Sequence, residues 1–158
     1  MFKIGDRVVY PMHGAGIIES IEERDFLGEL KAYYVMKLPF GGMKVMVPMN
    51  NVANIGLRQV VGMAEIDKVF NILRDRQKAA VTTWNRRVKA NMDKIKSGDI
   101  YEVAEVVRNL ALQDKEKKLS TGERRLLENA RQILISEMVL VQNIEEQKAA
   151  VMINELLE

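Results

Sequence analysis

Hydrophobic positions change their spacing near residue 58 of this 158-residue chain. Before that point, short runs rich in Val, Ile and Tyr alternate with turn residues, a pattern typical of short antiparallel strands. Pro and Gly between the runs allow the backbone dihedrals of tight turns. The pattern therefore predicts a small β-barrel of the SH3-like or Tudor-like kind. Four or five strands are expected, and four of them can be placed, at residues 7–10, 16–21, 32–38 and 43–47.

Beyond Leu57 the apolar residues recur every three or four positions, which is the spacing of amphipathic helices. The clearest example contains Ile100, Val103, Ala104, Val107, Leu110 and Ala111. Residues that can bond the free N–H groups of a first helical turn mark where the helices begin. Thr82 or Thr83 could cap a helix that contains Trp84, and Asp99 could cap the next.

Three further helices are expected in the same region. Ser120 and Glu123 have the spacing of a capping box, in which each side chain bonds the backbone N–H of the other residue. They would open a long helix, and a last helix is expected from about Glu145. An earlier one is predicted around residues 66–73, where apolar residues again follow a helical spacing.

Together the two patterns predict an α+β chain with two domains. Residues 1–58 would form the small antiparallel β-barrel, and residues 63–158 an all-α bundle of about five helices. The short segment between them could hold the domains rigidly or act as a hinge, and the pattern does not separate these alternatives.

The side chains available for chemistry are few. The chain has no Cys, which excludes a disulfide, a thiolate metal site and a cysteine nucleophile. Its one His, His13, cannot form a multi-histidine zinc site, and the glycines beside it lack the Lys and Ser/Thr of a phosphate-binding loop. Carboxylates such as Glu123 and Glu128 are expected on charged helical faces, paired with Lys or Arg. We therefore expect no catalysis, no metal and no cofactor.

Composition narrows the class of protein. The chain is 47% hydrophobic and 29% charged, as in folded globular proteins. Its opening residues lack the apolar stretch of a signal peptide, and no run approaches the ~18 apolar residues that a membrane span needs. A cytoplasmic protein is expected.

The net charge of +2 conceals a basic window at residues 74–96. This window holds eight Lys and Arg side chains against two Asp, a local net charge of +6. Such a concentration of positive charge can attract a polyanion. The alternative is a solvated helical face that keeps the protein soluble.

Trp84 is the only tryptophan, and it lies within this window. Arg86, Arg87 and Lys89 follow it within five residues. An aromatic side chain beside cations can supply both a stacking surface for a base and neutralisation of phosphates. In the alternative interpretation, Trp84 belongs to the apolar stripe of its helix and is part of the core.

Several motifs in the chain resemble the CarD family of bacterial transcription regulators. The opening, FKIGDRVVYPMHGAG at residues 2–16, is also similar to the polymerase-interacting module of transcription-repair coupling factors. The later motifs resemble only the CarD helical domain: WNRRVKAN at 84–91, KSGD at 96–99, VAEVVRNL at 103–110, LSTGER at 119–124 and ARQIL at 130–134. The resemblance covers essentially the whole chain.

The resemblance implies a partner for the first domain, the β subunit of RNA polymerase. One of the family's contact arginines matches Arg24, whose charge suits an acidic partner. A second family arginine falls at Met46, so this interface should depend more on apolar contact, with Met43 and Met49 nearby.

For the helical domain, the resemblance implies contact with promoter DNA at the upstream edge of the transcription bubble. Trp84 would wedge into the minor groove, and Arg86 and Lys89 would meet the DNA backbone, with Arg87 counted among the DNA-binding residues. The expected protein is a monomeric regulator, nucleoid-associated through RNA polymerase, that stabilises the open promoter complex. The alternative is an adaptor that binds another protein and makes no direct contact with DNA.

Overall fold

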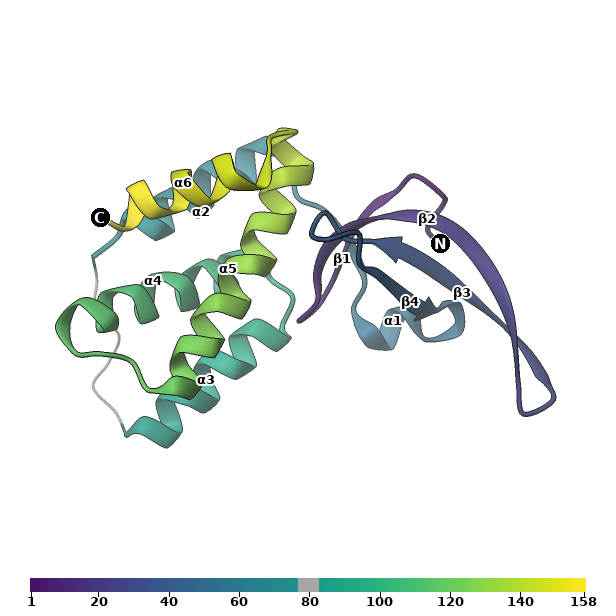
Figure 1. The fold of residues 1–158 in the computed structure, drawn as a ribbon, viewed down its shortest axis with the longest axis horizontal. Helices are drawn as coiled ribbons and strands as arrows, with labels where there is room; N and C mark the ends of the chain where they lie inside the picture. Colours follow the sequence, from purple (N-terminus) through teal and green to yellow (C-terminus); the bar gives the residue numbers. More distant parts are fainter. Residues whose placement is uncertain (77–82) are drawn as a thin grey trace.

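The computed structural model describes residues 1–76 and 83–158. Its first part is one antiparallel sheet with the strand order β4-β3-β2-β1-β5 (Figure 1). The strands are β1 (Arg7–Tyr10), β2 (Gly14–Phe26), β3 (Glu29–Lys37), β4 (Lys44–Pro48) and β5 (Arg58–Gln59). Each strand placed from the sequence overlaps one of β1 to β4, whereas β5 was not placed.

The hairpin of β2 and β3 is much longer than predicted. Its outer half pairs from Glu22 and Tyr33 to Phe26 and Glu29, and most of its side chains are exposed. Because neither face of this half is covered, no alternation of apolar and polar residues marks it in the sequence. The two turn residues, at 27 and 28, have φ of 53° and 83°, as a two-residue type I′ turn requires. The hairpin projects from the body of the sheet (Figure 1).

The sheet is open rather than closed into the predicted barrel. In the described part of the chain, no pairing joins the edge strands β4 and β5. One face is instead covered by a short helix that was not predicted, α1 (Val52–Ile55), which follows the 3-10 turn η1 (Met49–Asn51). Val52 and Ile55 pack against a core that includes Tyr34 and Met36. A helix thus buries apolar surface that barrel closure would have covered.

The described part of residues 63–158 is helical. Its helices are α2 (Met63–Arg74), α3 (Trp84–Lys96), α4 (Ile100–Glu116), α5 (Thr121–Gln142) and α6 (Glu146–Leu157). Thr83 caps α3 and Asp99 caps α4, as predicted. The other candidate cap, Thr82, lies outside the described residues, as does Lys78 of the basic window. Among the described helices, none is long and apolar enough to cross a membrane.

Helix α5 is the central element of the bundle. Its buried side chains include Ala130, Leu134 and Met138, which belong to the same apolar core as residues of α2, α3, α4 and α6. The C-terminal half of α5 also packs against β2 of the sheet. One helix therefore contributes both to the core of the bundle and to its contact with the sheet.

A buried ion pair joins the sheet to the bundle. Glu137 of α5 is 1% exposed, and both of its carboxylate oxygens lie 2.8 Å from guanidinium nitrogens of Arg58 in β5. The backbone N–H of Val61 donates to the same carboxylate at 2.9 Å. Arg58 also donates to the Gly98 carbonyl, which lies between α3 and α4. These bonds fix β5 and the following segment against two parts of the bundle, which favours a rigid connection over a hinge.

A second contact joins the two parts at β2. The hydroxyl of Ser136 accepts a hydrogen bond from the backbone N–H of Ala15 at 2.8 Å and donates to the Ile133 carbonyl. The chain approaches so closely that a Cβ at Gly14 would lie 2.8 Å from the Ser136 hydroxyl. Gly14 also has φ of +112°, where a side chain is strained. Glycine is therefore required here by both backbone conformation and space.

Replacement of Glu137 by Ala should strongly destabilise the protein. The substitution leaves the Arg58 guanidinium and the Val61 N–H without their buried acceptor. We expect the free energy of unfolding to fall by about 3 kcal/mol, the lower end for breaking a buried ion pair, because Arg58 remains 29% exposed. Urea denaturation followed by circular dichroism measures this change.

Glu105→Ala is the matched control for this experiment. It breaks the ion pair between Lys94 and Glu105, in which both side chains are about one-third exposed. Its expected cost is below ~1 kcal/mol, as for partly solvated pairs in general. If both variants lost the same free energy of unfolding, burial would not be the reason that Glu137 stabilises the protein.

Candidate nucleic-acid interface

The first turn of α3 presents Trp84 at the surface. Thr83 precedes the helix, and its hydroxyl accepts a hydrogen bond from the backbone N–H of Arg86. Trp84 lies on the same side of the helix as the buried Asn91 and Ile95, but its own side chain is 49% exposed. This end of α3 lies at the outer edge of the bundle, away from the sheet (Figure 1). The interpretation of Trp84 as a core residue is therefore wrong.

A cluster of polar residues lies beside the indole. We call it the cap cluster; it consists of Arg87, Gln113, Ser120 and Glu123. The indole N–H of Trp84 donates to the Ser120 hydroxyl in a long hydrogen bond of 3.4 Å. Glu123 is 2% exposed and forms an ion pair with Arg87, with a distance of 2.9 Å from Nε to the carboxylate. The cluster thus joins the starts of α3 and α5 to α4.

The capping box predicted at Ser120 and Glu123 is confirmed in one of its two bonds. The Ser120 hydroxyl accepts from the Glu123 backbone N–H at 3.2 Å and so caps α5. The Glu123 side chain does not make the return bond to the Ser120 backbone. Instead it turns inward, to the Ser120 hydroxyl, Arg87 and Gln113. The expectation that Glu123 lies on a solvated helical face is also wrong, because partners from two other helices bury it.

The pKa of the Glu123 carboxyl is lowered from its ordinary value of 4.5. Burial alone raises this pKa, because it disfavours the charged form. The hydrogen bonds from Arg87, Gln113 and Ser120, together with the positive charge of Arg87, lower it by more. The folded state therefore favours an ionised carboxylate at the base of Trp84.

Of the three cations that follow Trp84, two are exposed and one is used inside the fold. The Arg87 guanidinium is committed to Glu123 and is 29% exposed. Arg86 and Lys89 are exposed. At about 100° per residue they lie on the side of α3 that faces away from the buried Asn91. The positive charge available to a polyanion near Trp84 therefore comes chiefly from Arg86 and Lys89.

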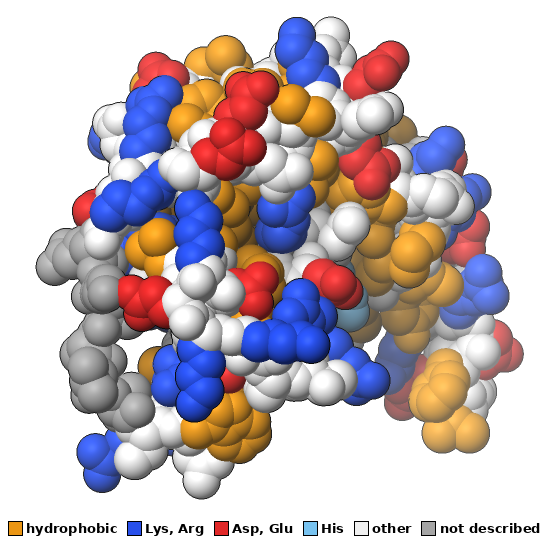
Figure 2. All heavy atoms as spheres, turned by 60° about the vertical axis from the view of Figure 1, so that its left-hand side comes forward, with side chains coloured by type: hydrophobic (Ala, Val, Ile, Leu, Met, Phe, Trp, Pro, Cys, Tyr) orange, Lys and Arg blue, Asp and Glu red, His pale blue; other side chains and the backbone are white. Residues whose placement is uncertain are grey.

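The basic window at 74–96 is not a single surface in its described part. Arg76 donates to the carbonyls of Leu73, Leu156 and Glu158 and so ties α2 to the C-terminus. Lys94 is paired with Glu105. Figure 2 shows the side of the bundle away from the sheet, where Lys and Arg are interspersed with carboxylates and apolar side chains. The local charge of +6 therefore overstates what the fold presents on one face.

The candidate polymerase-binding residues lie on one face of the sheet. Arg24 in β2 stands opposite Lys31 of β3, and Met46 in β4 stands opposite Val35 of β3. Lys31 and Val35 are four residues apart, so all four side chains point to the same face. Met46 is 37% exposed, and Arg24 is exposed and paired with Glu22 at 2.9 Å. About 13 Å of strand separates the two positions along the sheet.

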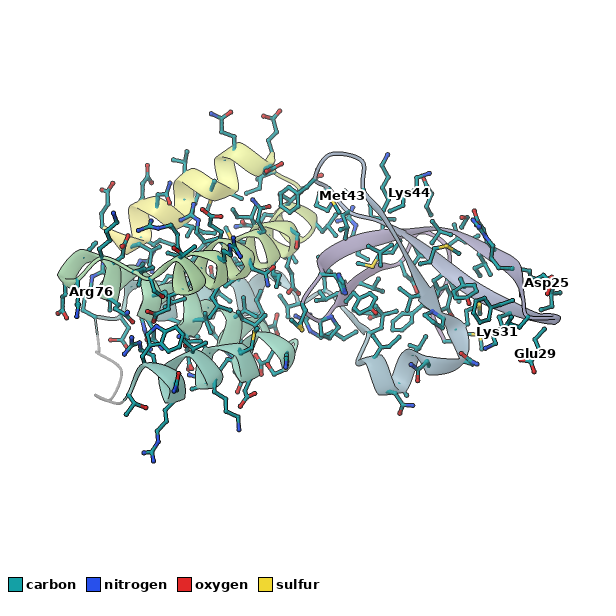
Figure 3. The ribbon with its side chains drawn as sticks, turned by 60° about the horizontal axis from the view of Figure 1, so that its bottom comes forward. Asp25, Glu29, Lys31, Met43, Lys44 and Arg76 are labelled. Carbon is teal, nitrogen blue, oxygen red and sulfur yellow. The ribbon has the colours of Figure 1, made fainter. Side chains whose placement is uncertain are left out.

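This face extends from the edge strand to the hairpin. Figure 3 shows Met43 and Lys44 at one end of the sheet and Lys31 near the hairpin tip, with Asp25 and Glu29 close by. Met43 is 59% exposed, whereas Met49 is half-buried. By strand alternation Glu29 and Lys31 share the face of Arg24, whereas Asp25 points to the opposite face. The face thus combines apolar contact at one end with mixed charge at the other.

Comparison with known proteins accounts for both parts of the chain. Residues 2–61 match the family model of the CarD-like/TRCF RID domain, and residues 68–154 match that of the CarD C-terminal domain. This chain belongs to the CarD family. A relative, "Putative transcription factor YdeB" of Bacillus subtilis (strain 168), is 43% identical over 148 residues, which are 94% of this chain and 97% of that protein.

One solved structure of a CarD protein is similar to a part of the chain. It is the solution NMR structure of the 72-residue N-terminal domain of Myxococcus xanthus CarD. The match is 34% identical and covers 37% of this chain and 79% of that chain, with a TM-score of 0.33.

Two further cations of this CarD-family chain, which the basic window did not include, lie just before the residue that bonds the Trp84 indole. Lys117 and Lys118 are exposed and precede Ser120, the residue that bonds the indole. The sequence contains the signal, a lysine-rich turn before a helix cap. Its proximity to Trp84 depends on packing of α3 against α5, over 36 residues of chain.

No metal site accompanies these residues. Within residues 1–76 and 83–158, no three His, Asp or Glu side chains gather closely enough to hold a metal ion. What the described site offers is therefore an exposed aromatic ring, exposed cations on the same helix and in the turn before Ser120, and a buried carboxylate that bonds Ser120, the hydrogen-bond partner of the ring.

The stability of the protein should depend on the ionisation of Glu123. As pH falls, the unfolded chain takes up a proton near its ordinary pKa of 4.5, and the folded chain only at lower pH. The carboxylate therefore contributes its full stabilisation above that value, and the contribution is lost as pH falls through the folded-state pKa. We expect the thermal unfolding midpoint to fall more steeply in the native protein than in Glu123→Gln as pH is lowered below about 4.5.

Glu128→Gln provides the control, because Glu128 is exposed on the same helix. This variant should keep the native pH dependence. If the thermal unfolding midpoint of Glu123→Gln fell with pH as steeply as that of the native protein, other carboxyl groups would account for the loss of stability in acid.

Proposed function

We propose that this CarD-family chain regulates transcription by binding RNA polymerase through residues 1–58 and promoter DNA through residues 63–158. The family models and the name of the relative YdeB support the polymerase and transcription parts of this proposal. The observation that carries the DNA part is the half-exposed Trp84 at the first turn of α3, with Arg86 and Lys89 exposed on the outward side of the same helix. The protein acts as a monomer at the nucleoid in the cytoplasm, by binding alone.

Trp84 acts as an apolar wedge in a distorted minor groove. Side chains of this kind enter between base steps and partly unstack them. Arg86 and Lys89 neutralise phosphates along the outward side of α3, and the first-turn N–H groups of α3 add the positive end of the helix dipole. Arg87 supports this contact from inside the fold, since its charge is paired with Glu123. Lys117 and Lys118 extend the basic surface around the indole.

Two weak contacts suffice when one tethers the other. Binding dominated by the DNA backbone has a dissociation constant of about 10⁻⁴ to 10⁻⁶ M, too weak to select promoters. A polymerase already at the promoter raises the effective DNA concentration to the order of mM. This effective concentration exceeds the dissociation constant roughly ten- to a thousandfold, so the DNA contact is mostly formed, and the polymerase supplies the choice of promoter.

The wedge changes the balance between closed and open promoter complexes. A ring that fits only opened or distorted DNA binds the open complex more tightly than the closed one. Each ~1.4 kcal/mol of this preference shifts the ratio tenfold toward the open complex. The readout is sequence-tolerant, because it follows the shape and deformability of the DNA. The protein therefore slows collapse of the promoter bubble.

The sheet binds the β subunit of RNA polymerase through the face that carries Arg24 and Met46. Arg24 suits an acidic partner, since a charged hydrogen bond to a carboxylate is stronger than a neutral one. Met46 and Met43 provide flexible apolar surface that can adapt to an irregular partner. Both methionines are accessible on this part of the sheet.

The dispersed charge of the basic window favours one alternative function. In it, the bundle is an adaptor that binds another protein through an apolar surface, without direct contact with DNA. The two functions differ in salt dependence, because phosphate contacts weaken steeply as ionic strength rises and apolar contacts do not.

Removal of Trp84 should abolish most of the effect on promoter opening. With a fluorescent base in the bubble, the native protein should raise the open fraction. Trp84→Ala should reduce the open-to-closed ratio by about tenfold, given ~1–3 kcal/mol for stacking of a base on an aromatic ring. The double variant Arg86→Glu, Lys89→Glu should lose DNA binding and its salt dependence.

Lys68→Glu combined with Lys148→Glu is the matched control, because it reverses two exposed charges on α2 and α6. It should leave opening close to native. If neither Trp84→Ala nor the Arg86, Lys89 variant differs from native protein, the adaptor function is correct instead.

Charge reversal at Arg24 should weaken binding to the polymerase β subunit. We expect Arg24→Glu to lower the affinity by about tenfold, as for loss of one charged hydrogen bond. Glu23→Lys is the control, because Glu23 lies on the opposite face of the same strand. Isothermal titration with the β subunit measures both variants, and a larger loss in Glu23→Lys would assign the contact to the other face.

A further inference from the structure

The Ser120 hydroxyl has three partners, and their chemistry determines the direction of each bond. The Trp84 indole N–H and the Glu123 backbone N–H can only donate, so the hydroxyl oxygen accepts from both. The ionised Glu123 carboxylate can only accept, so the hydroxyl proton goes to it, over 3.2 Å. The hydroxyl has one proton and two lone pairs, and all three are used.

The Glu123 carboxylate is saturated in the same way. One oxygen receives the Ser120 hydroxyl and an Arg87 N–H, at 3.2 and 3.4 Å. The other receives the Nε–H of Arg87 at 2.9 Å and the Gln113 amide at 3.1 Å. Four donors from three different segments therefore hold this carboxylate in one place. Since Glu123 is 2% exposed, it does not itself present a surface to DNA.

We propose that Ser120 and Glu123 are positioning residues that hold the Trp84 indole in its wedge orientation. This inference rests on the proposed function, because it assumes that Trp84 is the group that meets DNA. Glu123 takes the hydroxyl proton of Ser120 and thereby leaves a lone pair for the indole N–H. Arg87, three residues after Trp84, ties the same turn of α3 to the same carboxylate.

The orientation of an exposed indole matters for a wedge. A half-exposed ring with no polar partner samples several rotamers, and ordering it opposes binding. The cap cluster orders it on folding instead, so the ring is already oriented when DNA arrives. The indole N–H is turned toward α5, which leaves the apolar remainder of the ring available for contact with bases.

Fluorescence of Trp84 tests the positioning without DNA, because this is the only tryptophan of the chain. Ser120→Ala removes the acceptor. Glu123→Gln offers an amide that can donate to the hydroxyl and so competes with the indole for its lone pairs. In both variants the anchored orientation should become about fivefold less favoured, the factor that ~1 kcal/mol for one hydrogen bond represents. Acrylamide quenching should rise and fluorescence anisotropy should fall.

Two controls separate positioning from stability. Ser120→Thr keeps the hydroxyl and should restore native quenching and anisotropy. Asp99→Ala removes the cap of α4 and should lower the thermal unfolding midpoint while leaving the fluorescence of Trp84 native. Circular dichroism verifies that each variant is folded, and Ser120→Ala carries the test if Glu123→Gln does not fold. Native quenching and anisotropy in folded Ser120→Ala would overturn the proposal.

Promoter opening then distinguishes this inference from the proposed function. We expect Ser120→Ala and Glu123→Gln to lose about fivefold in affinity for a bubble-containing promoter fragment bound to polymerase, with Ser120→Thr close to native. If Trp84→Ala impairs opening but folded Ser120→Ala does not, the wedge is correct and the positioning role is wrong. If neither Trp84→Ala nor the Arg86, Lys89 variant has an effect, the proposed function fails, while the fluorescence still decides whether the cap cluster orients the ring.

Discussion

Burial of two ionisable carboxyl groups on one helix is the constraint on which this structure depends. A carboxylate removed from water must accept hydrogen bonds from nearby donors, and most of the donors to these two carboxylates come from outside α5. Glu137 finds Arg58 and the Val61 N–H at the sheet, and Glu123 finds Arg87 and Gln113 in the bundle. Each carboxylate thereby fixes a different part of the chain against α5. The apolar core supplies most of the burial, whereas these two groups specify which surfaces meet.

The two proposed binding functions are mechanically connected through this helix. The sheet, which we propose binds polymerase, is held at the Glu137 end of α5, and the first turn of α3, which carries Trp84, is held at the Glu123 end. Fourteen residues separate the two carboxylates, about 21 Å of helix. Trp84 can act as a wedge only if the polymerase-bound sheet holds it at a fixed place relative to the DNA. A rigid strut does this better than a flexible linker, which would spread the indole over many orientations.

Local rules predicted the parts of the fold that depend on near neighbours. Thr83, Asp99 and Ser120 begin helices because their side chains bond N–H groups two or three residues ahead, which sequence alone reveals. Glu123 was expected on a solvated face, because its burial depends on Arg87, 36 residues away. The outer half of the β2–β3 hairpin was missed because both its faces are exposed. Spacing alone left the exposure of Trp84 open, because its stripe matches the core. The resemblance to the CarD helical domain is what implied an exposed ring.

The distance between the two carboxylates also constrains how the gene can change. Fourteen residues are close to four helical turns, so Glu123 and Glu137 lie on nearly the same side of α5. Insertion or deletion of one codon between them would rotate one carboxylate by about 100° relative to the other and shift it by about 1.5 Å. If one carboxylate kept its hydrogen-bond partners, the other would lose its own. Substitutions can accumulate on the exposed side of α5, but the number of residues between Glu123 and Glu137 cannot change.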